Sequence, residues 1–290
     1  MHALIDGDIL LYKAAFSIES TTYIVRNGSH EFATDSAAGW RAYVKRLGLE
    51  KDEYELIRTR HTQDVRGAYK EVKRLIEEIT TNVHAKSWTL FLTGPDQYRQ
   101  KIDPNYKANR NDLDKPVHLY DVKDYMLRYK GAIEVPYIEA DDALGIMQMD
   151  DMRSVDNAID RASTIICTID KDLDTIPGHH YNIDSKEQYW VDEEDADYVF
   201  YKQMLVGDSG DNIAGIKGYG PVKSEKSLHI DPDSWYPTVR ALYKKAYGKD
   251  HEYMYDHTSK LLRICRHYAD IPKDCGVDIE KLEQVIYGTT

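Results

Sequence analysis

Short apolar runs alternate with amphipathic stretches along the first two thirds of the chain. Four runs of β-branched and apolar residues are typical of buried strands, and they lie at residues 3–6, 87–92, 132–135 and 163–168. Five stretches have the three-to-four-residue apolar spacing of helices, and they lie at 9–16, 36–47, 65–83, 117–130 and 141–152. Strands that alternate with helices predict an α/β fold, with a mostly parallel central sheet and flanking helices.

Two further patterns lie outside this alternation. Residues 22–32 place β-branched and aromatic residues around Asn27-Gly28, a strong signal for a β-hairpin. Residues 192–197 are acidic, which is typical of the first turn of a helix, here one that runs to Leu205. Beyond about 192 the chain has only helix and turn patterns. We therefore expect an α/β core over 1–191 and a helical region over 192–290 that packs on it.

The charge is unevenly distributed. The 290 residues carry a net charge of −12, which alone disfavours binding to nucleic acid. Residues 134–211 hold 20 Asp and Glu against five Lys and Arg, a net of −15, so the remaining 212 residues sum to +3. The acidity is regional and does not exclude a nucleic-acid partner.

The sequence lacks the features of membrane proteins and of secreted proteins. No apolar run reaches 18 residues, so we expect no membrane span. The N-terminus has neither a basic flank nor a small-residue cleavage site, so we expect no signal peptide. Cys167, Cys265 and Cys275 are few and scattered, which indicates a reducing, cytoplasmic compartment.

Acidic residues follow three of the predicted strands. Asp6 ends the first, the segment 139–142 follows the strand at 132–135, and the segment 170–172 follows the strand at 163–168. Ligands of α/β sheets bind at these strand ends, and clustered carboxylates suit Mg²⁺ or Mn²⁺. Each cluster alone is equally well explained as a helix cap or a turn. Together they favour a two-metal site that acts on a phosphodiester.

Two other segments contain residues that are candidates for phosphate binding. Residues 206–223 combine Asp208 and Asp211 with five glycines and precede a basic stretch. Glycines allow close backbone approach, and helix N-terminal amides bind phosphate; a simple interhelical linker is the alternative. Lys107 and Arg110 are three residues apart, on one face if the segment is helical. They can grip a phosphate, although a solvated surface helix explains the pair as well.

These motifs together resemble the 5′-nuclease superfamily, the flap endonuclease and 5′→3′ exonuclease group. The chain is especially similar to the short, polymerase-free members of T7-like bacteriophages. The resemblance runs from residue 4 to about 230. It rests on five motifs in the family's order, which are Ile5-Asp6-Gly7, residues 103–110, Glu139-x-Asp141-Asp142, residues 168–172, and Gly207-Asp208-x-x-Asp211-Asn212-Ile213 with Gly215-x-x-Gly218-x-Gly220.

The resemblance implies a role for each motif residue. One metal ion would be held, directly or through water, by Asp6, Glu139, Asp141 and Asp142, and a second by Asp170, Asp172, Asp208 and Asp211. Lys107 and Arg110 would be catalytic residues at the base of a helical arch (about 96–130), with Tyr106 stacking on a base. A helix–three-turn–helix element (about 203–230) would grip duplex DNA, often with K⁺, through residues that include Gly215, Lys217, Gly218, Gly220, Lys223 and Lys226.

The implied activity is hydrolysis of phosphodiester bonds with two Mg²⁺ or Mn²⁺ ions. The substrate would be DNA with a 5′ end, nick or flap, or an RNA–DNA hybrid, during phage replication or primer removal. We expect a monomer in the bacterial host cytoplasm. The alternatives are a PIN-like ribonuclease, which lacks the glycine-rich and arch segments, and a non-catalytic DNA-binding protein, which would have lost some of the acids.

One position departs from the family pattern. After the strand at 87–92 many members have a metal-site Asp, and this chain has Gly94. Asp96, Asp8 or a water molecule would have to take its place.

Overall fold

The computed structural model describes residues 1–110, 113–155, 162–228 and 231–288. Its internal contacts divide the chain into two compact units. The first consists of Met1–Ile9, Ile76–Asp114 and Leu127–Thr290, and the second of Leu10–Leu75 and Lys115–Met126. The division that we predicted at residues 191 and 192 falls inside the first unit, and as a functional division it stays a prediction.

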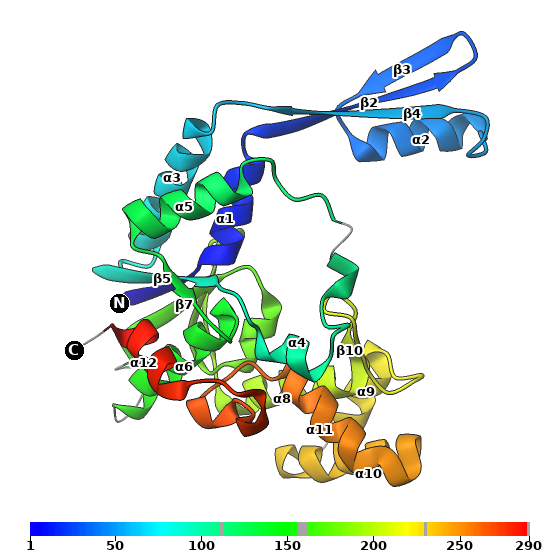
Figure 1. The fold of residues 1–290 in the computed structure, drawn as a ribbon. Helices are drawn as coiled ribbons and strands as arrows, with labels where there is room; N and C mark the ends of the chain where they lie inside the picture. The colour runs from blue at the N-terminus through cyan, green and yellow to red at the C-terminus, as the bar shows by residue number, and fades with distance from the viewer. Residues whose placement is uncertain (111–112, 156–161, 229–230, 289–290) are drawn as a thin grey trace. The chain divides into compact units, whose positions relative to one another are not determined.

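A six-stranded sheet forms the centre of the first unit (Figure 1). Its strand order is β6 (Ile133–Val135), β5 (Ser87–Thr93), β1 (His2–Asp6), β7 (Thr164–Thr168), β8 (Gly178–Asn182) and β9 (Gln188–Val191). All neighbours pair in parallel except β8 and β9, which are antiparallel. The predicted α/β fold with a mostly parallel sheet is confirmed.

Two apolar clusters stabilise the first unit. One joins β1, β5, β6 and β7 to α6 (Ala140–Arg153) and to the C-terminal helix α12 (Ile279–Tyr287). The other lies among the helices that follow the sheet, which are α8 (Glu193–Val206), α9 (Pro221–Leu228), α10 (Trp235–Tyr247) and α11 (His251–Leu262). The predicted acidic helix start is confirmed, since the Asp192 side chain accepts a hydrogen bond from the Asp195 amide at 2.7 Å.

The second unit contains a three-stranded antiparallel sheet of order β3 (His30–Thr34), β2 (Glu19–Asn27) and β4 (Glu55–Thr62). The predicted hairpin is confirmed, with Gly28 at φ +56° in its turn, where only glycine is unstrained. Helix α2 (Ala37–Leu47) packs on this sheet. Three helices pass from one unit to the other, namely α1 (Gly7–Phe16), α3 (Arg66–Asn82) and α5 (Leu119–Lys130).

The structure also contains elements that the pattern did not predict. They are the strands β4, β8 and β9, the short helix α4 (Tyr98–Ile102), and the two-residue strands β10 (Gly207–Asp208) and β11 (Ile213–Ala214). Parts of the predicted arch (111–112), of the predicted helix–three-turn–helix (229–230) and of the helical region (289–290) lie outside the described residues. Among the described helices none has the length and apolar character that a membrane crossing requires.

Candidate active site

The three predicted carboxylate clusters lie at one edge of the central sheet. Asp6 is the last residue of β1, Glu139 caps α6 shortly after β6, and Asp170 begins the 3₁₀ turn Lys171–Thr175 after β7. Because β6, β5, β1 and β7 are parallel neighbours, their carboxyl ends share this edge. The sequence-based placement of the clusters is confirmed.

Asp6, Asp141 and Asp170 crowd one another at this edge. Asp6 is buried, and it accepts hydrogen bonds from Thr168 Oγ1 at 2.8 Å and from the Ile9 amide at 3.1 Å. Burial, and then the neighbouring Asp8, raise the pKa of Asp6 to about 7. Burial also raises the pKa of Asp141 well above its usual value, with further repulsion from Asp6 and Asp170. This crowding favours a bound cation.

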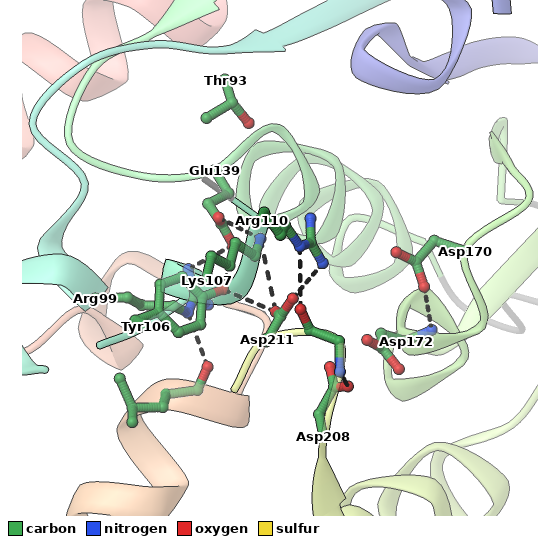
Figure 2. Close-up of polar contacts among 12 residues, drawn as sticks. Thr93, Arg99, Tyr106, Lys107, Arg110, Glu139, Asp170, Asp172, Asp208 and Asp211 are labelled. Atoms are coloured by element: carbon green, nitrogen blue, oxygen red, sulfur yellow. Dashed lines mark hydrogen bonds and ion pairs between the residues drawn. The ribbon is translucent and has the colours of Figure 1, made fainter. Parts of the chain in front are cut away.

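A second acidic group continues from the first. Burial, followed by repulsion from Asp170, Asp208 and Asp211, raises the pKa of Asp172 to about 7. Gln203 Nε2 donates to Asp172 Oδ1 at 2.6 Å, so α8 helps to orient this carboxylate. Figure 2 shows Asp170 and Asp172 facing Asp208 and Asp211.

Two cations lie against the acids on the other side of the site. Lys107 Nζ is 2.5 Å from Glu139 Oε1 and 3.6 Å from Asp211 Oδ2, and Arg110 pairs with Asp211 (Figure 2). Lys107 has a left-handed backbone (φ +56°) and precedes the 3₁₀ turn Ala108–Arg110. The two side chains therefore converge through a turn, and not along one face of a helix.

Tyr106 takes a different place from the one we expected. Its ring is only 4% exposed and lies in the apolar cluster with Phe200 and Met204, so in this conformation no base can stack on it. Its hydroxyl lies 2.8 Å from Glu139 Oε2 and 3.0 Å from Asp211 Oδ2. Tyr106 thus holds two candidate ligands in position.

Asp142 is a correction to the expected metal ligands. Its side chain is fully buried, and Arg99 binds it through two hydrogen bonds of 2.6 and 2.8 Å. The amides of Cys265 and Glu139 donate to the same carboxylate at 2.9 and 3.1 Å. These four donors leave no lone pair directed at an ion. Despite burial, Arg99 keeps the pKa of Asp142 below its usual value.

The structure also distinguishes the two acids that could replace the Asp missing at Gly94. A side chain at Gly94 would meet the Val135 carbonyl oxygen at 2.5 Å, so the backbone path leaves no room for one. Asp96 is exposed with φ +64°. Asp8 accepts from the Thr93 amide at 3.3 Å and is the foremost charged neighbour of Asp6. Of the two acids, Asp8 is therefore the one that lies beside Asp6 in the carboxylate cluster.

The donor atoms of the site fit a metal ion in their chemistry but not in their present spacing. Within the described ranges, no three His, Cys, Asp or Glu side chains lie close enough together to hold an ion as they stand. The donors themselves are hard carboxylate oxygens, as Mg²⁺ and Mn²⁺ require. Burial and then repulsion between neighbouring acids raise the pKa values of Asp6, Asp141 and Asp172. The chemistry of the site fits a hard divalent cation, on which the side chains would have to close.

The glycines of the segment 206–223 differ in their surroundings: two are packed against backbone, and two face open space. Gly207 and Gly215 are in close contact, because a side chain on Gly215 would meet the Gly207 amide nitrogen at 2.4 Å. Gly215 therefore closes the β10–β11 turn. Gly218 and Gly220 face open space. The lysines of the segment are exposed, and they are Lys217, Lys223 and Lys226.

Three contributors were not identified from the sequence, namely Arg99, Thr168 and Gln203. The partners of Arg99 and Gln203 lie 43 and 31 residues away along the chain. Thr168 donates to Asp6 across 162 residues. No local spacing signals contacts of this kind; only the fold brings these residues to the acids.

The chain is similar in sequence to two phage exonucleases over part of its length. No family model matches the chain. It is 32% identical to the exonuclease of Escherichia phage T7 over 130 residues, 42% of this chain and 40% of that protein. It is 30% identical to the exodeoxyribonuclease of Enterobacteria phage T3 over the same shares. The match thus spans about 40% of the length of these curated relatives.

The fold comparison covers nearly the whole chain. The T5 5′-exonuclease with bound zinc ions superposes with a TM-score of 0.56 at 14% identity, covering 99% of this chain and 98% of that one. The bacteriophage T5 flap endonuclease, in a complex with DNA and metal ions, gives 0.54 at 14% identity, covering 99% and 97%. The chain thus has the fold of the phage T5 5′-exonuclease and partial sequence similarity to the T7 and T3 exonucleases, which confirms its resemblance to the 5′-nuclease superfamily.

Proposed function

We propose that the chain is a divalent-metal-dependent 5′ nuclease that hydrolyses phosphodiester bonds at the 5′ end or 5′ flap of DNA. The observation that carries the proposal is the edge of the sheet where Asp6, Asp141 and Asp170 converge opposite Lys107. The fold of a 5′-exonuclease and the sequence similarity to two phage exonucleases support it.

Two Mg²⁺ or Mn²⁺ ions are the proposed cofactors. One would be held by Asp6, Glu139 and Asp141, and the other by Asp170, Asp172, Asp208 and Asp211. When bound, such ions activate water and stabilise the oxygen that leaves the phosphodiester. Two T5 structures with bound metal ions support this proposal by their fold. Asp142 is left out because Arg99 neutralises it.

Lys107 and Arg110 have a proposed role as phosphate ligands. Each is paired with a carboxylate of the site, so the two proposed ions, one at Glu139 and the other at Asp211, would release both side chains. The freed ammonium and guanidinium would then bind the scissile phosphate and offset its developing charge.

The glycine-rich segment has a proposed role in holding the duplex. Gly218 and Gly220 leave open space for a phosphate backbone, and the lysines around them are exposed. The partner would be DNA with a 5′ end, nick or flap, or an RNA–DNA hybrid, and K⁺ would bind at this turn. We further propose a monomer that acts in phage replication or primer removal in the host cytoplasm.

The test is a Mg²⁺ titration with a 5′-labelled flap DNA. Wild-type protein should release 5′-phosphorylated products only with Mg²⁺, and Asp141→Asn should lower the single-turnover rate by at least about 100-fold while DNA binding remains. The matched control is Asp96→Asn, an exposed acid outside the cluster, which should cleave at the wild-type rate. Cleavage of single-stranded RNA alone would indicate a PIN-like ribonuclease. Binding without any cleavage would indicate a non-catalytic DNA-binding protein.

A further inference from the structure

Helix α2 and the β3–β2–β4 sheet form a small module within the second unit. The helix runs along the sheet (Figure 1). Its inner side is aromatic: Tyr43 stacks on Phe32 with ring centroids 4.2 Å apart, and Trp40 lies 6.4 Å from Tyr23. Packing on the sheet therefore accounts for this side of the helix.

The other side of α2 is basic and uncovered within this module. Arg41, Lys45 and Arg46 are exposed. The exposed Ala38 and Ala42 lie on the same face of the helix, three or four residues from these cations. The helix contains no acidic residue. In the part of the chain that the structure describes, no ion pair neutralises any of the three cations. The helix thus presents three cations that no ion pair balances, and it lies outside the acidic block at residues 134–211.

Helix stability explains only part of this arrangement. Lys45 and Arg46 lie in the last turn, where cations stabilise the helix dipole by about 0.3–1 kcal/mol. Arg41 lies in the middle of the helix, where this effect is absent. The guanidinium of Arg41 lies 5.5 Å from the Trp40 ring centroid and that of Arg46 lies 5.6 Å from the Tyr43 ring centroid. These contacts hold both charges on the surface.

A small cavity adjoins the basic face. Its volume is about 190 Å³, and its lining combines the aromatic rings, the small helix residues and one cation, namely Phe32, Gly39, Ala42, Tyr43 and Arg46. Aromatic rings beside cations are the combination with which proteins bind single-stranded nucleic acid. A sugar or an unpaired base can enter a cavity of this kind, whereas a base inside a duplex is not available to it.

We propose that this face of α2 binds the backbone of single-stranded nucleic acid independently of its sequence. Phosphates contact Arg41, Lys45 and Arg46, and one sugar or base enters the cavity beside Arg46. The choice of a nucleic acid as the anionic partner rests on the proposed nuclease function. The surface shares no residue with the carboxylate site, so the two can be tested apart.

The test measures binding of a labelled 20-residue oligothymidylate to the full chain by fluorescence anisotropy. The measurement is made in EDTA, where no cleavage occurs, across a series of salt concentrations. The test variant is the triple substitution Arg41→Ala, Lys45→Ala and Arg46→Ala. The control removes the same charge from three exposed lysines in the first unit, Lys86, Lys273 and Lys281. A second variant, Ala42→Glu, places a carboxylate between the cations at the cavity.

The triple variant should bind about tenfold more weakly, and its slope of log K against log salt should fall in magnitude by about 2, the value for three lost single-strand phosphate contacts. Ala42→Glu should weaken binding as well, and the lysine control should bind as wild type does. Equal binding by the wild type and both α2 variants would overturn the inference and leave the face to an acidic protein partner. A wild type that cleaves no DNA, combined with weaker binding by the triple variant, would overturn the nuclease proposal alone.

Discussion

The two sides of the carboxylate site differ in how their charges are balanced. On one side, Glu139, Asp142 and Asp211 pair with Lys107, Arg99 and Arg110. On the other side, Asp6, Asp141, Asp170 and Asp172 form no ion pair with any Lys or Arg that the structure describes. The pKa of Asp142 is lowered, and those of Asp6, Asp141 and Asp172 are raised. Burial also raises the pKa of Asp211, although Lys107 and Arg110 oppose the rise.

This difference separates carboxylates whose charge is already balanced by a cation of the chain from those that have no such partner. Glu139 and Asp211 would exchange their present partners for the proposed ions, whereas Asp142 would keep Arg99. A paired carboxylate has its charge balanced within its own chain, and removal of either partner is costly. A crowded, unpaired carboxylate costs stability until an ion or a proton arrives. Adjacent residues can lie on opposite sides of this division, as Asp141 and Asp142 do. Three experiments test this difference between the paired and the unpaired carboxylates.

The largest expected effect is that of Asp142→Asn on stability. The substitution leaves the buried Arg99 guanidinium without its balancing charge, which should lower the free energy of unfolding by about 3–5 kcal/mol. Asp141→Asn is the matched control, since it changes the same group one residue away. It removes a like charge, so the melting temperature in EDTA should rise or stay constant. Urea denaturation of both variants measures the effect, and equal destabilisation by the two would remove the distinction between the sides.

The second effect is the pH dependence of stability without metal. Asp6 and Asp172 have pKa values of about 7 in the fold, against about 3.9 in an unfolded chain. Between these values the folded state binds more protons, so stability should fall as the pH rises from about 4 to 7. For the buried Asp6 the fall should be on the order of 2–3 kcal/mol.

Calorimetry in EDTA and in Mg²⁺, with buffers from pH 4.5 to 7.5, measures this fall. Mg²⁺ should restore the lost stability at pH 7, because a bound cation favours the ionised carboxylates. Asp6→Asn should flatten the profile measured in EDTA. A wild-type profile that is level in EDTA would mean that these acids are not short of positive charge.

The sequence predicted those parts of the molecule that depend on local pattern. The apolar runs predicted the positions of strands β1, β5 and β7, and Asn27-Gly28 predicted the position of the hairpin. The acids at the strand ends followed from the topology of parallel sheets. Strand β8, which lies between β7 and β9, was missed because its segment Gly178-His179-His180 is polar and lacks the alternation of a half-buried strand.

The remaining features depend on contacts between distant parts of the chain. Asp141 and Asp142 are adjacent residues of the same type, so the sequence does not distinguish them. Only the position of Arg99 in the fold shows that Asp142 is the neutralised one. Tyr106 next to Lys107 has the pattern of a stacking residue, yet α8 supplies a cluster that buries its ring. Residues 115–126 join the second unit through contacts with segments far from them in sequence, such as the stacking of Tyr125 on Tyr69 at 4.3 Å.

The smallest expected effect is that of Tyr106→Phe. Burial raises the pKa of Tyr106, so its hydroxyl stays protonated and donates to Glu139 or Asp211. The phenylalanine ring keeps the packing, and loss of the hydrogen bond should cost about 1 kcal/mol of stability. Glu139 and Asp211, both on the paired side, lose the hydroxyl that aligns them, so the apparent affinity for Mg²⁺ should fall about tenfold.

The cleavage rate of Tyr106→Phe at saturating Mg²⁺ should recover to near the wild-type value, which is the signature of a positioning residue. Tyr287→Phe is the matched control, since its hydroxyl donates to Asp150 outside the site. It should lose comparable stability with no change in the Mg²⁺ midpoint. An unshifted midpoint in Tyr106→Phe would show that this hydroxyl does not align the two carboxylates. The paired side would then be held by Lys107, Arg99 and Arg110 alone.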